Sequence, residues 1–298
     1  MFICLDLGGT HLRGACFSQG KLGPVLLTEH GQSLSGLKQA LLEMIETLAR
    51  GKEIKALGIA SAGPFLRKAR VFLTPPNLPY LQGFAVGKFL AEHFHFPLLL
   101  ENDAQAAALG EVHFGCLKGA QNALVLTLGT GLGSGIVLKG KLFRANLETG
   151  PELGHLFWGG LDRCGCGKRG CIETLLQARA LLNLASKEGL NLAQVKDLTP
   201  LLEKKEPRAW RVMKDYGQTL GTFLAEMVQL FGFEDIALSG GISYLGKYFL
   251  PFVQETLENR LKSRVELKPR RLVLSENPEQ SGLWGMAYLL TKTFNPEE

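Results

Sequence analysis

Three cysteines and one histidine lie close together in the middle of the chain, at a spacing typical of a metal site. Cys164, Cys166 and Cys171 fall within eight positions, and three thiols cannot all pair as disulfides. His155 is the nearest candidate for a fourth ligand, and one imidazole with three thiolates suits tetrahedral Zn²⁺. Because all four ligands come from the protein, the pattern predicts a closed, structural zinc site. The alternative is a group of free thiols in a reducing compartment.

Two glycine-rich turns, DLGGTHLR (6–13) and TLGTGLGSG (127–135), each separate two predicted strands. Glycine leaves backbone N–H groups bare, so a phosphate can approach them closely. In the first turn Asp6 supplies a carboxylate of the kind that Mg²⁺ prefers, and Thr10 and Arg13 supply groups for phosphate oxygens. The second turn departs from the dinucleotide-binding pattern, because a strand rather than a helix follows it. A glycine-rich hairpin without a ligand is the alternative for either turn taken alone.

Predicted strands and helices alternate along the chain, which indicates the α/β class. Strands are expected at 2–7, 12–17, 25–30, 56–61, 97–102, 123–128, 134–139, 236–240 and 271–275. Helices are expected at 33–50, 84–94, 103–115, 173–186, 207–231, 246–262 and 279–294. The succession of strand, glycine turn and strand occurs twice, at 2–17 and 123–139, which predicts two similarly built halves that face one cleft.

The overall composition is that of a globular protein. The 298 residues are 46% hydrophobic and 20% charged, enough for one large or two medium domains. The net charge of +5 is mild, and the basic clusters at 67–70 and 260–271 contain no interleaved aromatic residues, so we expect solvated surfaces there. The N-terminus has no basic lead, and the longest uncharged run (121–138) is interrupted by glycines. A cytoplasmic protein is therefore expected.

Seven motifs occur in a fixed order along nearly the whole chain, and together they resemble the ROK family of sugar kinases and related repressors. The resemblance is greatest to the bacterial glucokinase-like members. The motifs are DLGGT (6–10), PPNLP (75–79), ENDAQAAALGE (101–111), LTLGTGLGSGIV (126–137), ETGPELGH (148–155), CGCGKRGCIE (164–173) and LSGGIS (238–243).

The resemblance implies the actin-like ATPase fold, which is ribonuclease H-like, with two α/β domains around an interdomain cleft where ATP and sugar meet. The smaller N-terminal domain is expected to comprise residues 1–115 and 280–298. The larger domain, residues 116–279, is expected to carry the zinc cluster.

The resemblance also assigns a general base. Asp103 is similar to the family residue that takes a proton from the sugar hydroxyl as this attacks the γ-phosphate. A second interpretation makes Asp103 the N-cap of the alanine-rich helix that follows, and the two roles are compatible. His155 matches a family residue that contacts both sugar and zinc. The positions that match sugar-binding residues are Asn77, Asn102, Asp103, Glu152, His155 and Glu173.

Nucleotide-binding positions of the family match residues in both glycine turns and in a third segment. Those for phosphate and Mg²⁺ are Asp6, Gly8, Gly9, Thr10, Arg13, Thr130, Gly131 and Gly133. Those on the adenosine side are Gly240 and Gly241. The implied cofactors are ATP, Mg²⁺ and a structural Zn²⁺. The implied partners are a small-molecule hexose and a second copy of the chain, with no nucleic acid and no membrane.

Some positions depart from the usual family pattern around the expected sugar pocket, notably Ala62, Gln105 and Pro151. Glucose phosphorylated at the 6-hydroxyl is the leading expectation. An N-acetylhexosamine or fructose as substrate, and polyphosphate as donor, stay open. The first predicted strand starts at Phe2, and Asp103 is present. A kinase is therefore expected rather than a DNA-binding repressor or a sugar sensor without catalysis.

Overall fold

The computed structural model describes residues 1–144 and 150–295, which form two compact units. Of these residues, the first unit comprises 1–115, 142–144, 150–151 and 280–295, and the second comprises 116–141 and 152–279. The sequence-based division had assigned 142–151 to the second domain. The first two residues of the predicted motif ETGPELGH, at positions 148 and 149, lie outside the described residues.

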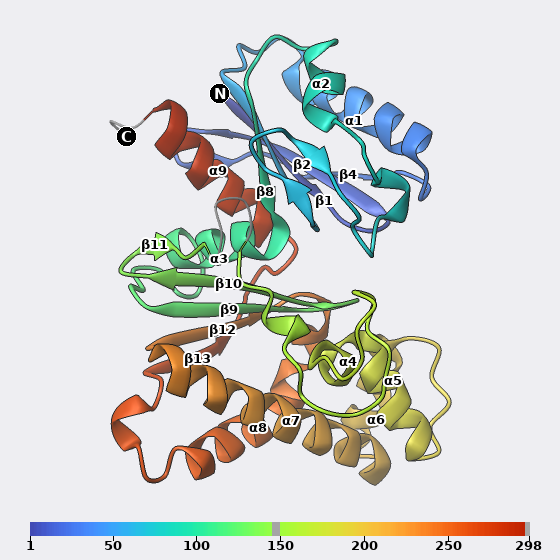
Figure 1. Cartoon of the computed structure of the whole chain (residues 1–298), viewed down its shortest axis with the longest axis vertical. Coiled ribbons are helices and arrows are strands. Elements are labelled where there is room, and N and C mark those ends of the chain that lie inside the picture. The colour runs from blue at the N-terminus through green and yellow to red at the C-terminus, as the bar shows by residue number, and fades with distance from the viewer. Residues whose placement is uncertain (145–149, 296–298) are drawn as a thin grey trace. The chain divides into compact units, whose positions relative to one another are not determined.

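The first unit is built on a six-stranded sheet with the order β3-β2-β1-β5-β8, in which β4 also pairs with β2 (Figure 1). Its strands are β1 (Phe2–Leu7), β2 (His11–Ser18), β3 (Lys21–Leu22), β4 (Leu26–Glu29), β5 (Ala56–Ser61) and β8 (Leu98–Asn102). β1 and β2 form an antiparallel hairpin, whereas β1, β5 and β8 run parallel. Leu7, Ser61 and Asn102 are aligned in register, so the parallel strands end together at one edge of the sheet.

Helices cover both faces of this sheet (Figure 1). The helices of the unit are α1 (Leu34–Ala49), α2 (Val86–Ala91), α3 (Asp103–His113) and α9 (Ser281–Phe294), with the 3₁₀ turn η1 (Pro79–Leu81). α1 begins after Ser33, whose hydroxyl accepts a hydrogen bond from the N–H of Gly36 at 3.1 Å. It buries an apolar stripe that includes Leu37 and Leu41 against one face. The apolar side of α9 packs on the other face.

The α3 and α9 helices of the first unit pack unusually closely. A Cβ atom at Gly110 would overlap the carbonyl oxygen of Ser281, and one at Gly285 would overlap that of Ala106. Ser281 also donates a hydrogen bond to the buried carboxylate of Glu111. The small residues of the alanine-rich helix therefore serve to bring two backbones together, and they fix the position of α3.

The second unit repeats the plan of the first. Its five-stranded sheet has the order β11-β10-β9-β12-β13, in which β9 pairs antiparallel with β10 and parallel with β12. The strands are β9 (Ala123–Leu128), β10 (Leu132–Leu138), β11 (Lys141–Leu142), β12 (Asp235–Ser239) and β13 (Arg271–Leu274). Two hairpins, each continued into a parallel sheet, confirm the internal repeat and the α/β class that the sequence predicted.

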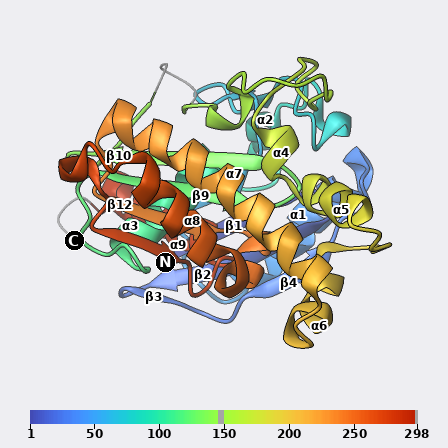
Figure 2. The same cartoon turned by 90° about the horizontal axis from the view of Figure 1, so that it is seen from below.

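The longest helices of the second unit lie side by side (Figure 2). They are α7 (Pro207–Phe231) and α8 (Gly246–Arg260), and the shorter helices are α4 (Glu173–Leu176), α5 (Ala178–Lys187) and α6 (Leu198–Glu203). The 3₁₀ turns are η2 (Leu153–His155), η3 (Val195–Asp197), η4 (Gly241–Leu245) and η5 (Val265–Leu267). Gly217 and Gly221 let α7 approach α8, because a Cβ at either would lie 2.7 Å from a carbonyl oxygen of α8.

Two local predictions are wrong. The helix expected at 173–186 is divided, because Gln177 has an extended backbone (φ −77°, ψ 168°) between α4 and α5. The second basic cluster is not simply a solvated surface, since Arg270 and Arg271 donate hydrogen bonds to the fully buried carboxylate of Asp235. The hairpin of β6 (Phe65–Leu66) and β7 (Val71–Phe72) was not predicted.

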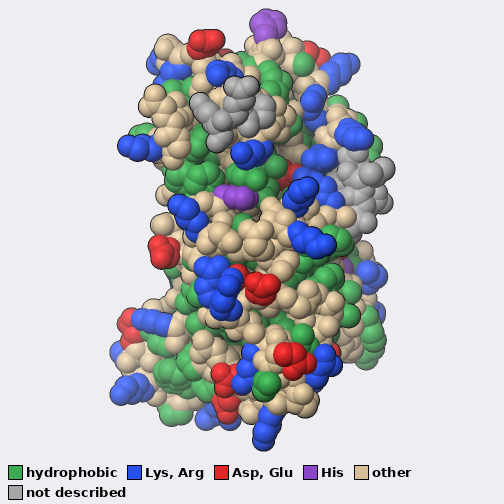
Figure 3. Space-filling model, turned by 90° about the vertical axis from the view of Figure 1, so that its left-hand side faces the viewer, with side chains coloured by type: hydrophobic (Ala, Val, Ile, Leu, Met, Phe, Trp, Pro, Cys, Tyr) green, Lys and Arg blue, Asp and Glu red, His purple; other side chains and the backbone are tan. Residues whose placement is uncertain are grey.

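The surface carries its charges in small groups. On the face shown in Figure 3, Lys and Arg side chains are scattered among neutral and acidic ones and form no continuous basic patch. Among the described residues, no helix combines the length and the apolar character needed to cross a bilayer.

Candidate active site

Two carboxylates lie at the edge of the first unit's sheet where the parallel strands end. Asp6 is the penultimate residue of β1 and lies opposite Arg13 in β2. Asp103 follows β8 directly and opens α3. Both side chains are partly buried. The pKa of Asp6 is raised to about 7, first by loss of hydration and then by the negative charge of Asp103, while Arg13 acts to lower it. The two acids are therefore near enough to repel each other, which suits a site for a divalent cation.

Asn102, and not Asp103, is the N-cap of α3, so the alternative interpretation of Asp103 is wrong. The side-chain oxygen of Asn102 accepts a hydrogen bond from the N–H of Gln105 at 3.1 Å. Asp103 is the first helical residue, and its Oδ1 accepts from the N–H of Ala104 at 2.8 Å. Burial raises the pKa of Asp103, and backbone N–H donors partly offset that rise. Asp103 is thus a fixed carboxyl group with raised basicity.

The first glycine turn keeps its backbone open. Gly9 and Thr10 are exposed, and the nearest atom to a Cβ built at Gly9 would be the carbonyl oxygen of Asn77, 3.9 Å away. Asn77 itself is exposed, whereas the neighbouring Leu78 is fully buried and anchors the loop. The first unit therefore places the glycine turn close to the loop that carries Asn77.

A buried histidine that the sequence did not single out connects these two segments. His30 is 2% exposed, and its Nε2 lies 3.0 Å from the carbonyl oxygen of Gly8. A carbonyl can only accept, so Nε2 carries the proton, and in neutral His30 Nδ1 accepts from the Tyr80 hydroxyl at 3.2 Å. Tyr80 follows the PPNLP motif. No local motif marks this pair, because the two residues are 50 positions apart.

The four predicted metal ligands are brought together in the second unit. Single ligand atoms of His155, Cys164, Cys166 and Cys171 all lie within 4.8 Å of one another. Nδ1 of His155 is 3.5 Å from Sγ of Cys164, and Sγ of Cys166 is 3.8 Å from Sγ of Cys171. A tetrahedral ion bound to sulfur at about 2.3 Å separates neighbouring ligands by roughly 3.8 Å. The donor set and its spacing therefore fit Zn²⁺.

The backbone around these ligands forms a tight loop. The N–H of Cys164 donates to the carbonyl of Lys168 at 2.9 Å, and the N–H of Gly167 donates back to Cys164 at 3.0 Å. Gly167 adopts φ 90°, in the region that favours glycine. Burial acts to raise the pKa of the Cys166 thiol. Hydrogen bonds outweigh this effect and lower the pKa, and the first of them comes from the N–H of Lys168. The loop thus brings the thiols of Cys164, Cys166 and Cys171 together.

Two predicted sugar-binding residues are attached to this cluster. Oε1 of Glu173 accepts from Sγ of Cys164 at 3.1 Å, and Oε2 accepts from the N–H of Leu132 at 3.0 Å. His155 directs Nδ1 toward the thiols, while its Nε2 lies 4.0 Å from the carboxylate of Glu152. The cluster therefore holds Glu173 through Cys164 and places the Nε2 edge of His155 near the carboxylate of Glu152.

The second glycine turn lies beside the third predicted nucleotide segment. Thr130 and Gly131 lie in the turn that joins β9 to β10, and Gly133 is the second residue of β10. Gly240 follows β12 with φ 84°, and a Cβ there would lie 2.5 Å from the carbonyl oxygen of Leu128, at the end of β9. Gly241 opens η4. Each unit thus gathers its own share of the predicted site residues. That both sets act on one ligand stays a prediction.

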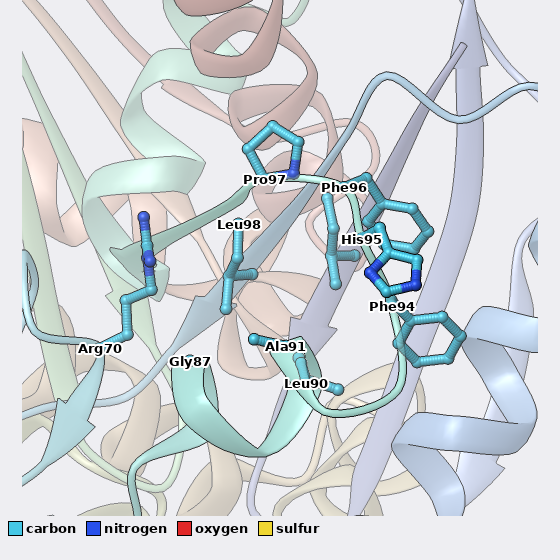
Figure 4. Close-up of a pocket in the computed structure, with 10 residues that line it drawn as sticks. Arg70, Gly87, Leu90, Ala91, Phe94, His95, Phe96, Pro97 and Leu98 are labelled. Atoms are coloured by element: carbon cyan, nitrogen blue, oxygen red, sulfur yellow. The ribbon is translucent and has the colours of Figure 1, made fainter.

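A pocket of about 400 Å³ in the first unit is separate from these residues. Figure 4 shows it between α2 and the chain that leads into β8, with Arg70 beside Gly87 and with Phe94, His95 and Phe96 along the loop. No residue of the predicted site lines it. We assign no ligand to this pocket.

Comparison with known proteins identifies the family. The family model described as "ROK family" matches residues 2–293. A ROK family glucokinase from Streptomyces griseus, solved in complex with glucose and AMPPNP, superimposes with a TM-score of 0.85 at 25% identity and covers 97% of this chain and 98% of its own. A ROK hexokinase from Thermus thermophilus gives 0.84 at 30% identity, with 98% and 99% coverage. The fold is therefore the actin-like ATPase fold, and the chain belongs to the ROK family, as its motifs predicted.

Sequence relatives differ in their activities. A glucokinase from Streptomyces coelicolor is 30% identical and aligns over 96% of both chains. An N-acetylmannosamine kinase from Haemophilus influenzae is 26% identical over 86% of this chain and 85% of its own. A xylose repressor from Caldicellulosiruptor bescii is 28% identical over 91% of this chain and 76% of its own. Family membership alone therefore leaves both the substrate and the kind of function open.

Proposed function

We propose that this protein is an ATP-dependent hexose kinase that phosphorylates glucose at the 6-hydroxyl. The observation that carries the proposal is the position of Asp103, fixed at the start of α3 with a raised pKa and beside Asp6. A regulator has no need of a base beside a second carboxylate. The likeness to a glucokinase that binds glucose and AMPPNP supports both substrates.

In the proposed reaction, Asp103 accepts the proton of the sugar hydroxyl as its oxygen forms a bond to the γ-phosphorus. The bond between that phosphorus and the bridging oxygen breaks, and ADP leaves with the electron pair. The raised pKa makes Asp103 a stronger base than a solvated carboxylate. A Mg²⁺ ion held by Asp6 would neutralise phosphate charge, while Arg13 and the exposed turn at Gly9 and Thr10 would hold the phosphate oxygens.

The sugar is proposed to be held by groups from each unit. Asn102 and Asn77 come from the first unit, and Glu152, His155 and Glu173 come from the second. When the thiols hold Zn²⁺, Cys164 has no proton to give to Oε1 of Glu173. That oxygen then needs another donor, and a sugar hydroxyl supplies one. In this proposal the metal orders the residues that bind the sugar and takes no part in the phosphoryl transfer.

A second candidate is an N-acetylhexosamine kinase, because an N-acetylmannosamine kinase is among the relatives. An assay of ADP release that compares glucose, mannose, fructose, N-acetylglucosamine and N-acetylmannosamine separates the candidates. Glucose is expected to give the highest kcat/KM. Parallel assays with ATP and with inorganic polyphosphate identify the donor. If no hexose releases ADP, a sensor or regulator becomes the better proposal.

Asp103→Asn tests the proposed base directly. The amide keeps the size and the helix-start geometry but accepts no proton, so kcat should fall by about 10²–10⁴-fold. Binding of glucose, measured by calorimetry, should persist. Asp215→Asn, at an exposed position on α7, is the matched control and should keep wild-type kcat. Wild-type turnover in Asp103→Asn would remove Asp103 from this role.

A further inference from the structure

Glu101, which directly precedes Asn102 and Asp103, is a buried carboxylate with two guanidinium groups beside it. Glu101 is 2% exposed and lies at the end of β8, directly before Asn102 and Asp103. Arg144 approaches it as a fork, with Nη1 donating to Oε1 at 3.1 Å and Nη2 donating to Oε2. Nη1 of Arg67 lies 3.6 Å from Oε2. A buried carboxylate with such partners stays ionised and holds them in a fixed direction.

Arg144 binds the first turn of α3 as well as the end of β8. Its Nη1 also donates to Oε1 of the buried Gln105 at 3.2 Å. One guanidinium therefore contacts residues on both sides of Asn102 and Asp103. Those two residues are the N-cap and the proposed base, and their orientation depends on the angle between strand and helix.

The chain that leads into the second unit rests on the same turn. Gly150 packs against Gln105 so closely that a Cβ at position 150 would overlap its carboxamide. Pro151 is then joined by a peptide bond to Glu152, the first residue of this segment assigned to the second unit. Arg144 and Gly150 thus both contact Gln105 in the first turn of α3.

We propose that Arg144 is a positioning residue for phosphoryl transfer. Through Glu101 and Gln105 it sets the orientation of Asn102 and Asp103, and through Gln105 it supports the turn of α3 against which Gly150 packs. This inference depends on the proposed function, because the residues that it positions are those assigned to the hexose. Arg144 itself contacts no reacting atom in this account.

The chain offers a matched control in its second unit. Asp235 is fully buried and is held by Arg271, whose Nε donates to Oδ1 at 2.6 Å, and by Arg270, whose Nη2 donates to Oδ2 at 2.7 Å. The chemistry is the same as at Glu101. However, Asp235 and Arg271 are the first residues of two parallel strands. Ligands in such sheets bind beyond the carboxyl ends of the strands, so this pair lies at the opposite end of the sheet. Loss of this control pair should affect stability alone.

The kinetic test compares Arg144→Met with Arg271→Met. We expect Arg144→Met to lower kcat by roughly 10–100-fold, because small displacements of reacting groups have effects of this size. KM for glucose should rise several-fold and KM for ATP should change little. Arg144→Lys, which keeps the charge but loses the fork, should recover only part of kcat. The Glu101→Gln/Arg144→Met double variant should lose less than the two single losses combined, because the buried carboxylate that Arg144 pairs with is removed together with it.

A second measurement does not depend on activity. Hydrogen–deuterium exchange of the 102–107 and 150–155 amides should be faster in Arg144→Met than in wild type, and unchanged in Arg271→Met. Equal kcat and glucose KM in Arg144→Met and wild type, or unchanged exchange in these segments, would overturn the positioning role. If wild type phosphorylates no hexose, the proposed function fails, while the exchange result still decides whether Arg144 orders these segments.

Discussion

The first unit places Asp6 and Arg13 opposite each other across the β1–β2 hairpin, whereas the second unit has Thr127 and Gly133 at the corresponding places of the β9–β10 hairpin. Both hairpins continue into parallel strands in the same order. The shared architecture therefore supplies two open glycine turns, and the side chains beside them make one turn charged and the other neutral. Within the first unit, the charged turn lies near the proposed catalytic base Asp103.

The two units also fix their proposed sugar-binding groups by different means. In the first unit Asn102 and Asp103 are held by the end of a strand and the start of a helix. In the second unit Glu152, His155 and Glu173 lie outside the sheet and around the thiol cluster. The sheet edge is held by backbone hydrogen bonds and by ion pairs such as that of Arg144 with Glu101, whereas a loop outside the sheet needs a cross-link. This difference predicts that the second unit depends on a metal and the first does not.

The largest expected effect follows from removing the metal. Cys164→Ser, or treatment with a strong zinc chelator, should eliminate bound zinc and lower Tm by many degrees, because structural zinc sites contribute on the order of 10 kcal/mol. KM for glucose should rise, since Glu173 and His155 lose their support. Metal analysis, calorimetry and kinetics measure the three effects.

Cys116→Ser is the control for this experiment, because Cys116 lies outside the cluster. It should keep one zinc per chain. Freshly purified wild type with far less than one equivalent of zinc, or full glucose affinity after zinc removal, would contradict the proposed dependence of the second unit on metal.

Asp6→Asn should separate activity from stability. Loss of a proposed Mg²⁺ ligand should lower kcat by about 10²-fold, equivalent to roughly 2.7 kcal/mol. The folded protein holds the proton of Asp6 up to a pKa of about 7, whereas the unfolded chain loses it near the usual value of 3.8. Ionisation therefore destabilises the fold increasingly as the pH rises between these values.

Because asparagine has no charge, the Tm of Asp6→Asn should exceed that of wild type at pH 8 in Mg²⁺-free buffer. The difference should shrink steadily as the pH is lowered from 7 toward 4. Asp215→Asn should show no such trend. A Tm difference independent of pH would mean that Asp6 has an ordinary pKa and is not crowded by Asp103.

The smallest effects are expected at two glycines. A Cβ at Gly9 meets nothing closer than 3.9 Å, so Gly9→Ala should keep the wild-type Tm and raise only KM for ATP. Gly240 has φ 84° and lies against Leu128, so Gly240→Ala should cost about 1–3 kcal/mol of stability. Unchanged KM for ATP in Gly9→Ala would indicate that phosphate does not approach the first turn.

The sequence predicted elements best where the pattern was long or strongly apolar. The bounds of β5, β9 and α7 agree residue by residue with the predicted ranges 56–61, 123–128 and 207–231. The interpretation of Asp103 as the N-cap of α3 was one residue off, because Asn and Asp are equally good caps and only the backbone angles separate neighbouring positions. Gln177 interrupts an otherwise helical pattern through its extended backbone, which composition does not reveal.

Site residues were predictable where a local motif marked them. The cysteine spacing predicted the cluster that the structure assembles. In contrast, the partners of Glu101 and His30 are far away in the sequence, with Arg144 separated by 43 positions and Tyr80 by 50. Such pairs depend on how strands and loops are brought together, so no local pattern in a single sequence indicates them.

The close packing of α3 and α9 has a consequence for synthesis in the cell. The apolar core on one face of the first sheet includes Leu283, Met286 and Leu290, which the ribosome adds after every residue of the second unit. That face of the N-terminal sheet therefore lacks the side chains of α9 until the second unit has been synthesised. During translation, chaperones that bind apolar surfaces should therefore stay bound to the N-terminal part of this chain for longer than to the second unit.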